Sequence, residues 1–275
     1  MTVKVNGLDY HVEIWNDDKS PTIVFLHGFT GSTKTWQRIA GSLSDYKVVL
    51  VDLLGHGKTA VPEDASRYVM ELQVRDLHDL FSELGFTEFV LAGYSMGGRT
   101  ALAYAIAHPE RLQGLILESA SPGLKTAAEQ VERQQRDSEL ALTILANGIQ
   151  SFVDKWENIP LFDSQKKLPF EIRDEIKQER LSQQPQGLAN SLIGMGTGSQ
   201  PSYWNHLKDI HVPVLLITGS MDLKFEAIAG EMKTAFLQVQ HQIVEAGHAI
   251  HVEKPAEFAT IVDEYLRLNI QGGKS

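Results

Sequence analysis

The stretch Gly93-Tyr94-Ser95-Met96-Gly97 constrains this chain more than any other, because of what stands on either side of it. Residues 88–92 are short and apolar and predict a buried strand, whereas residues 100–107 are alanine-rich and predict a helix. A serine between two such elements sits on a sharp, strained turn, where larger neighbours would collide with the strand and the helix. We therefore predict that Ser95 presents a nucleophilic hydroxyl, and that the Met96 N–H at the start of the helix is an oxyanion donor.

The surrounding pattern predicts an α/β fold with a mostly parallel central sheet flanked by helices. Alternating residues in 2–6 and 10–15 indicate an antiparallel hairpin at a sheet edge, and helical segments at 33–43, 67–84 and 255–268 are interspersed with further strands. Those strands are expected at 22–26, 46–51, 112–117, 213–219 and 240–244. Residues 122–208 lack a clear strand and are polar and helical, so we predict a helical cap at 122–208 inserted between core segments 1–121 and 209–275.

Composition limits the partners that the chain can have. With 35 acidic and 25 basic residues, the net charge of −10 argues against nucleic acid and anionic membranes as partners. No cysteine is present, which excludes disulfides and thiolate metal sites. The histidines do not form a metal-binding set, and no signal peptide or membrane-spanning segment is evident. We expect a cytoplasmic protein with no cofactor, no metal and no membrane insertion, as a monomer or homodimer.

The loops after two early strands carry a resemblance. His27-Gly28-Phe29 follows residues 22–26, and Asp52-Leu53-Leu54-Gly55-His56-Gly57 closes the next strand. Together with the Ser95 turn, these segments resemble the α/β-hydrolase superfamily. That resemblance implies the α/β-hydrolase fold and the Phe29 N–H as a second oxyanion donor, while His27 braces its loop.

A serine needs an imidazole and a group that orients the imidazole, and in this superfamily the chain order is serine, acid, histidine. Asp222 stands just past the strand 213–219, and His248 lies in a Gly-His loop after the last strand, so we assign Ser95, Asp222 and His248 as a catalytic triad. Three alternatives stay open: Glu118 as the acid, His251 as the base, or Asp222 acting only as a helix cap.

A nearer resemblance extends over almost the whole chain. The segments that carry it are Gly93 to Arg99, Glu118-Ser119-Ala120-Ser121-Pro122-Gly123-Leu124, Arg133, Trp156 with Pro160-Leu161-Phe162, Arg180, and Gly194 to Pro201. Together they resemble the 2-succinyl-6-hydroxy-2,4-cyclohexadiene-1-carboxylate synthases of menaquinone biosynthesis. The resemblance implies a lyase that eliminates pyruvate from a small substrate with three carboxylates.

The same resemblance implies a substrate site formed by Tyr94, Arg99, Arg133, Trp156 and Arg180, with Arg136 as the alternative to Arg133. Arg99 follows Ser95 by four residues and shares a helix face with it, and guanidinium groups bind carboxylates in a bidentate manner. From the residues alone, the cap arginines would be solvated and Trp156 would belong to the core. Two other functions remain open, a serine hydrolase of esters or carbon–carbon bonds and a non-catalytic receptor for a small ligand.

Overall fold

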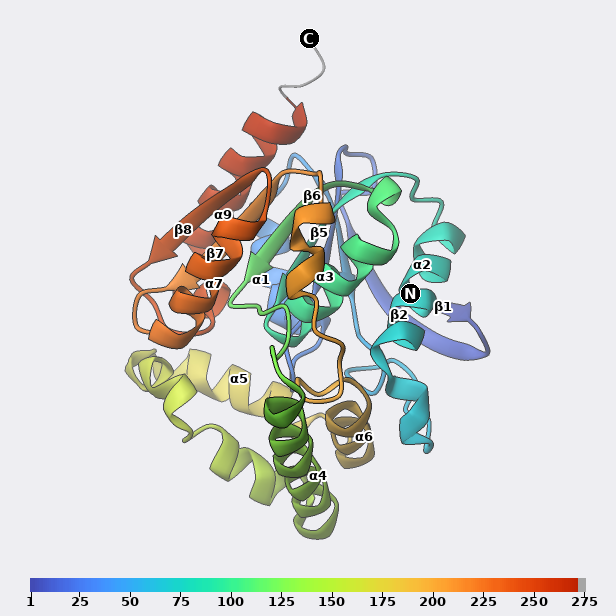
Figure 1. Ribbon diagram of the computed structural model, residues 1–275, viewed down its shortest axis with the longest axis vertical. Coiled ribbons are helices and arrows are strands. Elements are labelled where there is room, and N and C mark those ends of the chain that lie inside the picture. Colours follow the sequence, from blue (N-terminus) through green and yellow to red (C-terminus); the bar gives the residue numbers. More distant parts are fainter. Residues whose placement is uncertain (272–275) are drawn as a thin grey trace.

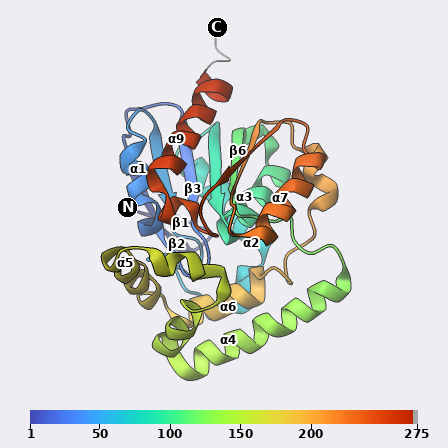
Figure 2. The same ribbon diagram turned by 90° about the vertical axis from the view of Figure 1, so that its left-hand side faces the viewer.

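The computed structural model describes residues 1–271 and contains one eight-stranded sheet with helices on both faces (Figures 1 and 2). The strands lie in the order β1-β2-β4-β3-β5-β6-β7-β8. Strands β1 and β2 form the antiparallel edge, and β2 also pairs antiparallel with β4, whereas the other neighbours pair in parallel. The bounds are β1 Thr2–Val5, β2 Leu8–Trp15, β3 Thr22–Leu26, β4 Lys47–Val51, β5 Phe89–Tyr94, β6 Leu112–Glu118, β7 Val214–Gly219 and β8 Val239–Val244.

Alternation along the buried strands divides the core into two apolar layers. In β3, Val24 and Leu26 pack on one side with α2 (Met70–Glu83), α3 (Met96–Ala107) and α7 (Leu223–Ala235). Ile23 and Phe25 pack on the other side with α1 (Gln37–Ser42) and α9 (Pro255–Leu266). Because side chains alternate across a strand, a β3 that is buried on both faces must be apolar throughout. The predicted α/β architecture, a mostly parallel central sheet flanked by helices, is confirmed.

The helical insertion lies between β6 and β7, at the end of the sheet where the parallel strands have their carboxyl termini (Figure 1). It contains α4 (Ala127–Trp156), the 3₁₀ helix η4 (Pro160–Lys167), α5 (Phe170–Leu181) and α6 (Pro185–Met195). Thr126 caps α4 reciprocally with Glu129, and Gly148 interrupts its helical geometry with φ 74° and ψ 173°. We call this insertion the cap and keep its predicted bounds, 122–208, as its definition.

Several local predictions differ from the structure. Residues 33–43, expected as one helix, form a 3₁₀ helix (Thr33–Trp36) followed by α1 (Gln37–Ser42). The helix expected at 67–84 begins at Met70, because Val69 is extended with ψ 148° and a separate 3₁₀ turn precedes it. The last α-helix ends at Leu266 rather than 268, and residues 267–271 form a π turn. A short helix α8 (Ile250–Glu253) follows the His248 loop and was not expected.

Candidate active site

Ser95 occupies the predicted turn between β5 and α3. Its φ of 51° and ψ of −105° are outside the regions that side chains prefer, and its N–H is held at 2.9 Å by the carbonyl of Glu118. The flanking glycines are needed for space, because a Cβ on Gly93 would lie 2.3 Å from the carbonyl oxygen of Gly97. A Cβ on Gly97 would lie 2.2 Å from the carbonyl oxygen of Leu26. The strain at Ser95 is thus imposed by close packing on both sides.

Ser95, His248 and Asp222 form a hydrogen-bonded chain. His248 Nε2 lies 3.1 Å from Ser95 Oγ, and His248 Nδ1 donates to Asp222 Oδ2 at 2.6 Å. Because the carboxylate accepts from Nδ1, Nε2 is left unprotonated and can accept the serine proton. Asp222 Oδ1 also accepts from the Phe225 N–H at 3.3 Å at the start of α7. Asp222 therefore caps α7 with one carboxylate oxygen and accepts from His248 with the other.

Glu118 and His251, the alternative acid and base, bond to each other. Glu118 accepts from His251 Nδ1 at 2.7 Å and from the His251 backbone N–H at 3.1 Å, and both side chains are buried. His251 stacks against Trp36 with ring centroids 4.3 Å apart. Among the described residues the structure thus contains two buried acid–histidine pairs, and the pair that bonds to Ser95 is the one made by Asp222 and His248.

The residues that carry the two expected oxyanion donors line the same cavity as the serine. Phe29, Met96, Ser95 and His248 all line a cavity of about 250 Å³ under the cap. His27 braces the loop before Phe29, because its Nε2 accepts the Leu53 N–H at 3.0 Å and its Nδ1 donates to the Gly28 carbonyl at 2.8 Å. Burial lowers the pKa of His27 to about 4, so this brace is neutral.

Arg99 brings a positive charge into the Ser95 cavity. It is 9% exposed, and its Nη1 donates to the Met195 carbonyl at 2.8 Å and to Gln200 Oε1. Burial lowers its pKa to about 10, so the group remains charged at neutral pH. Both partners of Nη1 are uncharged, so no carboxylate forms a hydrogen bond with this nitrogen.

Arg133 and Arg136 differ in their ion-pair partners and in their position relative to the cavity. Arg133 lines the Ser95 cavity and donates from Nε to the buried Asp137 at 2.8 Å. Arg136 pairs with Glu132, and both side chains are exposed, outside the cavity lining. Of the two alternatives, the structure places Arg133 at the cavity.

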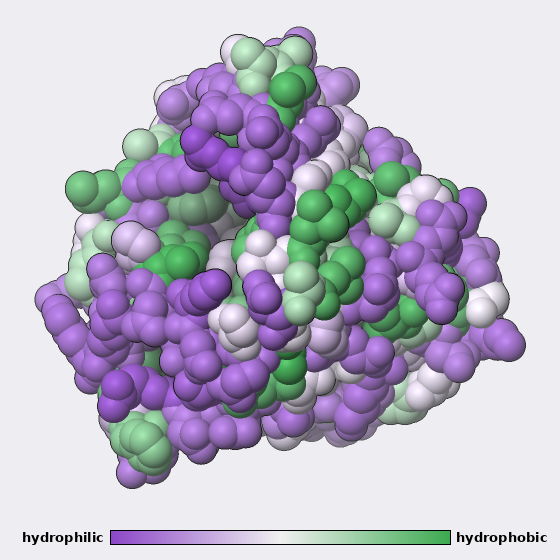
Figure 3. All heavy atoms as spheres, turned by 90° about the horizontal axis from the view of Figure 1, so that it is seen from below, coloured by the Kyte–Doolittle hydropathy of each residue, from purple (hydrophilic) through white to green (hydrophobic). Residues whose placement is uncertain are grey.

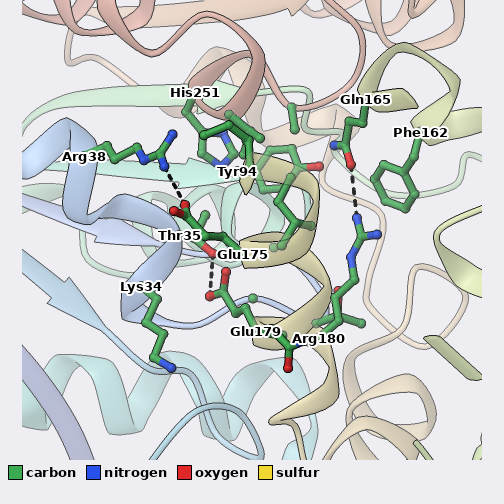
Figure 4. Close-up of a pocket in the computed structure, with 18 of the residues that line it drawn as sticks. Lys34, Thr35, Arg38, Tyr94, Phe162, Gln165, Glu175, Glu179, Arg180 and His251 are labelled. Atoms are coloured by element: carbon green, nitrogen blue, oxygen red, sulfur yellow. Dashed lines mark hydrogen bonds and ion pairs between the residues drawn. The ribbon is translucent and has the colours of Figure 1, made fainter. Parts of the chain in front are cut away.

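Arg180 lies in a neighbouring cavity of about 420 Å³ between α5 and the segment after β3 (Figure 4). Arg180 is buried, and its Cζ lies 4.6 Å from the centroid of the Phe162 ring. Its Nη2 donates to Gln165 Oε1 at 3.3 Å. Phe162 and Tyr94, together with Phe29, line both cavities, so they form the shared wall. The structure therefore brings Arg180 to the other side of this wall from Ser95.

Two aromatic side chains of the cap, Trp156 and Phe162, line the Ser95 cavity. Trp156 lines it and packs against Phe29 at 5.5 Å and Phe162 at 5.9 Å between ring centroids. The Trp156 indole N–H is buried without a hydrogen-bond partner among the described residues, which leaves it as a donor for a ligand. From the cap end, the surface is mainly hydrophilic, with apolar side chains gathered around a hollow (Figure 3).

Sequence reasoning missed the residues that hold the arginines. Met195 and Gln200 position Arg99, and Asp137 positions Arg133. Gln200 lies in the glycine-rich segment 194–201, which the resemblance singled out without a role for this side chain. No pattern in the sequence links it to Arg99, 101 residues away.

Residues 1–271 contain neither a metal-binding cluster nor a membrane-spanning helix. No group of three or more histidine, aspartate or glutamate side chains there is arranged to hold a metal ion. Within the same range, none of the helices combines the length and the apolar character needed to cross a bilayer.

Comparisons with known proteins agree with this geometry. The model of the alpha/beta hydrolase fold family matches residues 21–255. A Bacillus subtilis (strain 168) protein named as a candidate 2-succinyl-6-hydroxy-2,4-cyclohexadiene-1-carboxylate synthase is 47% identical over 262 residues, which cover 95% of this chain and 96% of that protein. The synthase of that name from Enterobacter sp. (strain 638) is 32% identical over 252 residues, with 91% and 93% covered. The solved structure of MenH from S. aureus has a TM-score of 0.91 and 37% identity, covering 94% of this chain and 98% of that one.

Proposed function

The chain belongs to the α/β-hydrolase fold family and, within it, to the 2-succinyl-6-hydroxy-2,4-cyclohexadiene-1-carboxylate synthases, and we propose that it catalyses the reaction for which they are named. The substrate is 2-succinyl-5-enolpyruvyl-6-hydroxy-3-cyclohexene-1-carboxylate, and the products are the cyclohexadiene and pyruvate. This reaction is a step of menaquinone biosynthesis. The cytoplasm is the proposed compartment, which the cysteine-free composition supports.

The electron flow follows from a comparison of the double bonds in the substrate ring with those in the product ring. A proton leaves the ring carbon that carries the succinyl group, and its electron pair forms the new 2,3 double bond. The existing 3,4 double bond shifts to the 4,5 position, and the bond from carbon 5 to the enolpyruvyl oxygen breaks. The abstracted proton returns to the enolpyruvate, which becomes pyruvate, so no oxidant or cofactor is needed.

The triad supplies the base for this proton transfer. Asp222 orients His248, His248 takes the proton of Ser95, and the Ser95 oxygen removes the ring proton. Negative charge then develops on the succinyl carbonyl oxygen as an enolate. The N–H groups of Phe29 and Met96 are the proposed donors to that oxygen, as they would be to a tetrahedral intermediate in ester hydrolysis.

The observation that carries the proposal is the buried, charged Arg99 in the cavity that holds Ser95. A guanidinium in an enclosed cavity is costly unless its ligand is an anion, and this substrate carries three carboxylates. We propose that Arg99 and Arg133 each bind one carboxylate, and that Arg180 binds the third when the wall formed by Phe162 and Tyr94 admits it. Trp156 and Tyr94 supply hydrogen bonds and an apolar surface.

The test is the release of pyruvate from the substrate, which is generated in place by the preceding enzyme because it decays. Spontaneous release is subtracted, and Ser95→Ala is measured in parallel. We expect rapid release by the wild type and release near background by Ser95→Ala, with substrate binding largely retained. Wild-type release at the background rate would reject the synthase, and turnover of small activated esters would then favour a serine hydrolase.

The arginine roles are tested by a matched pair on α4. Arg133→Ala should raise KM by roughly tenfold or more, because one charge-assisted carboxylate contact is lost. Arg136→Ala removes the same charge from the same helix three residues away, where the side chain pairs with Glu132 outside the cavity. An equal rise in KM in both variants would show that long-range charge, and not a contact made by Arg133, attracts the substrate.

A further inference from the structure

Glu253, the last residue of α8, joins two parts of the molecule that the proposed reaction must keep together. Its Oε2 accepts the Gly247 N–H at 2.8 Å, and its Oε1 accepts the hydroxyl of Ser164 at 2.8 Å. Gly247 immediately precedes His248, whereas Ser164 belongs to η4 of the cap. One carboxylate therefore bonds both to the loop of the triad histidine and to the cap.

The junction between these two parts is tightly packed. A Cβ added to Gly247 would lie 2.0 Å from Ser164 Oγ and 2.9 Å from Glu253 Oε1. Real Cβ atoms do not approach other atoms so closely, so the cap turn lies directly against the backbone of the His248 loop. The absence of a side chain at Gly247 is thus required by the contact with Ser164.

The turn that Ser164 anchors also carries the wall of the active site. Phe162 lies two residues before Ser164, lines the cavities on both sides and has its ring centroid 6.5 Å from that of His248. Gln165, the next residue after Ser164, accepts the hydrogen bond from Arg180. The position of Ser164 therefore sets the positions of Phe162 and Gln165.

Other bonds between cap and core lie at a different place. Glu179 of α5 accepts from the hydroxyls of Ser32 at 2.6 Å and Thr35 at 2.9 Å, and Arg38 pairs with Glu175 (Figure 4). These bonds attach α5 to the segment after β3. The Glu253 bonds differ because they attach the cap to the loop that carries the triad histidine.

We propose that Glu253 is a positioning residue that keeps η4 and the His248 loop in register, so that His248 stays aligned on Ser95 while the cap encloses the substrate. The proposal rests on the proposed function for its substrate. A carboxylate suits this role because it accepts on both oxygens, and charge-assisted bonds to N–H and O–H donors are short and strong. Loss of the Gly247 bond should misalign His248, whereas loss of the Ser164 bond should loosen only the cap wall.

Three variants distinguish the effect of the bond from Glu253 to Gly247 from the effect of the bond to Ser164. Glu253→Ala removes both, Ser164→Ala removes only the cap bond, and Glu253→Gln can keep both, because its amide oxygen accepts from Gly247 and its amide N–H donates to Ser164 Oγ. Lys125→Met is the control, since it removes an ion pair between the cap and Glu231 of α7, with both side chains outside the two cavities and away from His248. Each variant is measured for pyruvate release, for melting temperature and for the rate of Ser95 labelling by a small fluorophosphonate.

The labelling rate reports Ser95 activation without the natural substrate. In that reaction the Ser95 Oγ–P bond forms, fluoride leaves and the serine proton passes to His248. We expect Glu253→Ala to lower kcat and the labelling rate by about 10- to 100-fold, as small misplacements of catalytic groups do. Ser164→Ala should raise KM by roughly three- to tenfold, the loss of one hydrogen bond, with kcat and labelling close to wild type.

Glu253→Gln should retain most of the activity, and Lys125→Met should keep the wild-type kcat and labelling rate. If Glu253→Ala is labelled at the wild-type rate, or if it only melts earlier while kcat per labelled site is unchanged, the positioning role is refuted. If Glu253→Ala does not fold, loss of labelling in the folded Glu253→Gln variant refutes the proposed rescue. If the wild type releases no pyruvate above background, the synthase proposal fails, and labelling alone decides the role of Glu253.

Discussion

Exchanging Gln200 for glutamate tests whether the charge of Arg99 attracts the substrate. Gln200 Oε1 accepts from Arg99 Nη1, and both side chains are buried, at 1% and 9% exposure. Gln200→Glu keeps the shape of the side chain and places a negative charge against the guanidinium. Because bulk water does not reach this pair, the new charge is poorly screened.

The expected effect differs between stability and binding. Opposite charges about 4 Å apart attract by on the order of 4 kcal/mol at an effective dielectric constant of 20. Burying the carboxylate costs several kcal/mol, and the amide donates to the Pro201 carbonyl at 3.4 Å, a bond that a carboxylate cannot make. These terms offset one another, so we expect the free energy of unfolding to change by less than about 2 kcal/mol. A substrate carboxylate, however, would meet an arginine that is already neutralised.

The loss of one charge-assisted contact costs about 1.5–3 kcal/mol of binding free energy. This cost corresponds to a rise in KM of roughly 10- to 100-fold. The value of kcat should stay within about threefold, because the triad is untouched. Pyruvate release measured over a range of substrate concentrations gives both constants. Gln200→Met is the control, since it removes the acceptor without adding charge and should change KM only a few-fold. A KM for Gln200→Glu within twofold of wild type, or equal to that of Gln200→Met, would refute the reasoning.

Three further predictions concern the triad, the pH dependence and the cap. Asp222→Asn should lower kcat by up to about 10⁴-fold, because an amide at this position favours the wrong tautomer of His248; near-normal pyruvate release would remove Asp222 from the triad. Burial lowers the pKa of His27 to about 4 and that of His56 to about 3, whereas both titrate near 6.5 when unfolded. As the pH falls, the unfolded chain therefore takes up protons before the folded chain does. The contribution of these two neutral histidines to the free energy of unfolding is complete above pH 6.5 and decreases as the pH falls towards 4, by roughly 2 kcal/mol per histidine at pH 5. Urea unfolding at pH 7 and pH 5 should show that His56→Gln loses less stability than wild type, and equal losses would contradict the assignment. Gly148→Ala should destabilise the protein by about 1–3 kcal/mol, because φ 74° and ψ 173° are accessible mainly to glycine, and an unchanged melting temperature would oppose this.

The serine, acid and histidine were predictable because each lies in a short motif at the end of a strand. Carboxyl ends of neighbouring parallel strands meet at one edge of a sheet, so local patterns suffice to bring them together. The choice between the two acid–histidine pairs was harder, because Glu118 also ends a strand and His251 is three residues from His248. Which histidine reaches Ser95 depends on the loop and short helix after β8, and no local pattern encodes their geometry.

The cap side chains show the limit of sequence reasoning more clearly. Arg133 and Arg136 are three residues apart on one helix, so helical periodicity places them on nearby faces. They differ in their partners, a buried Asp137 for the first and an exposed Glu132 for the second. Burial of a partner is a tertiary property, set by how α4 packs on α6, and the sequence of α4 alone does not contain it.

The partners also rank the arginines as anion sites. Arg133 is held by a carboxylate, so part of its charge is neutralised before a ligand arrives, whereas the Nη1 of Arg99 is held by a carbonyl and an amide oxygen. The two guanidinium groups repel each other, and Asp137 offsets that repulsion at Arg99, as the direction of these effects on its pKa indicates. In a chain with a net charge of −10, a buried cation with uncharged partners is the stronger local attractor for an anion. Removal of Arg99 should therefore weaken substrate binding more than removal of Arg133, and the ratio of the two KM values measures that difference.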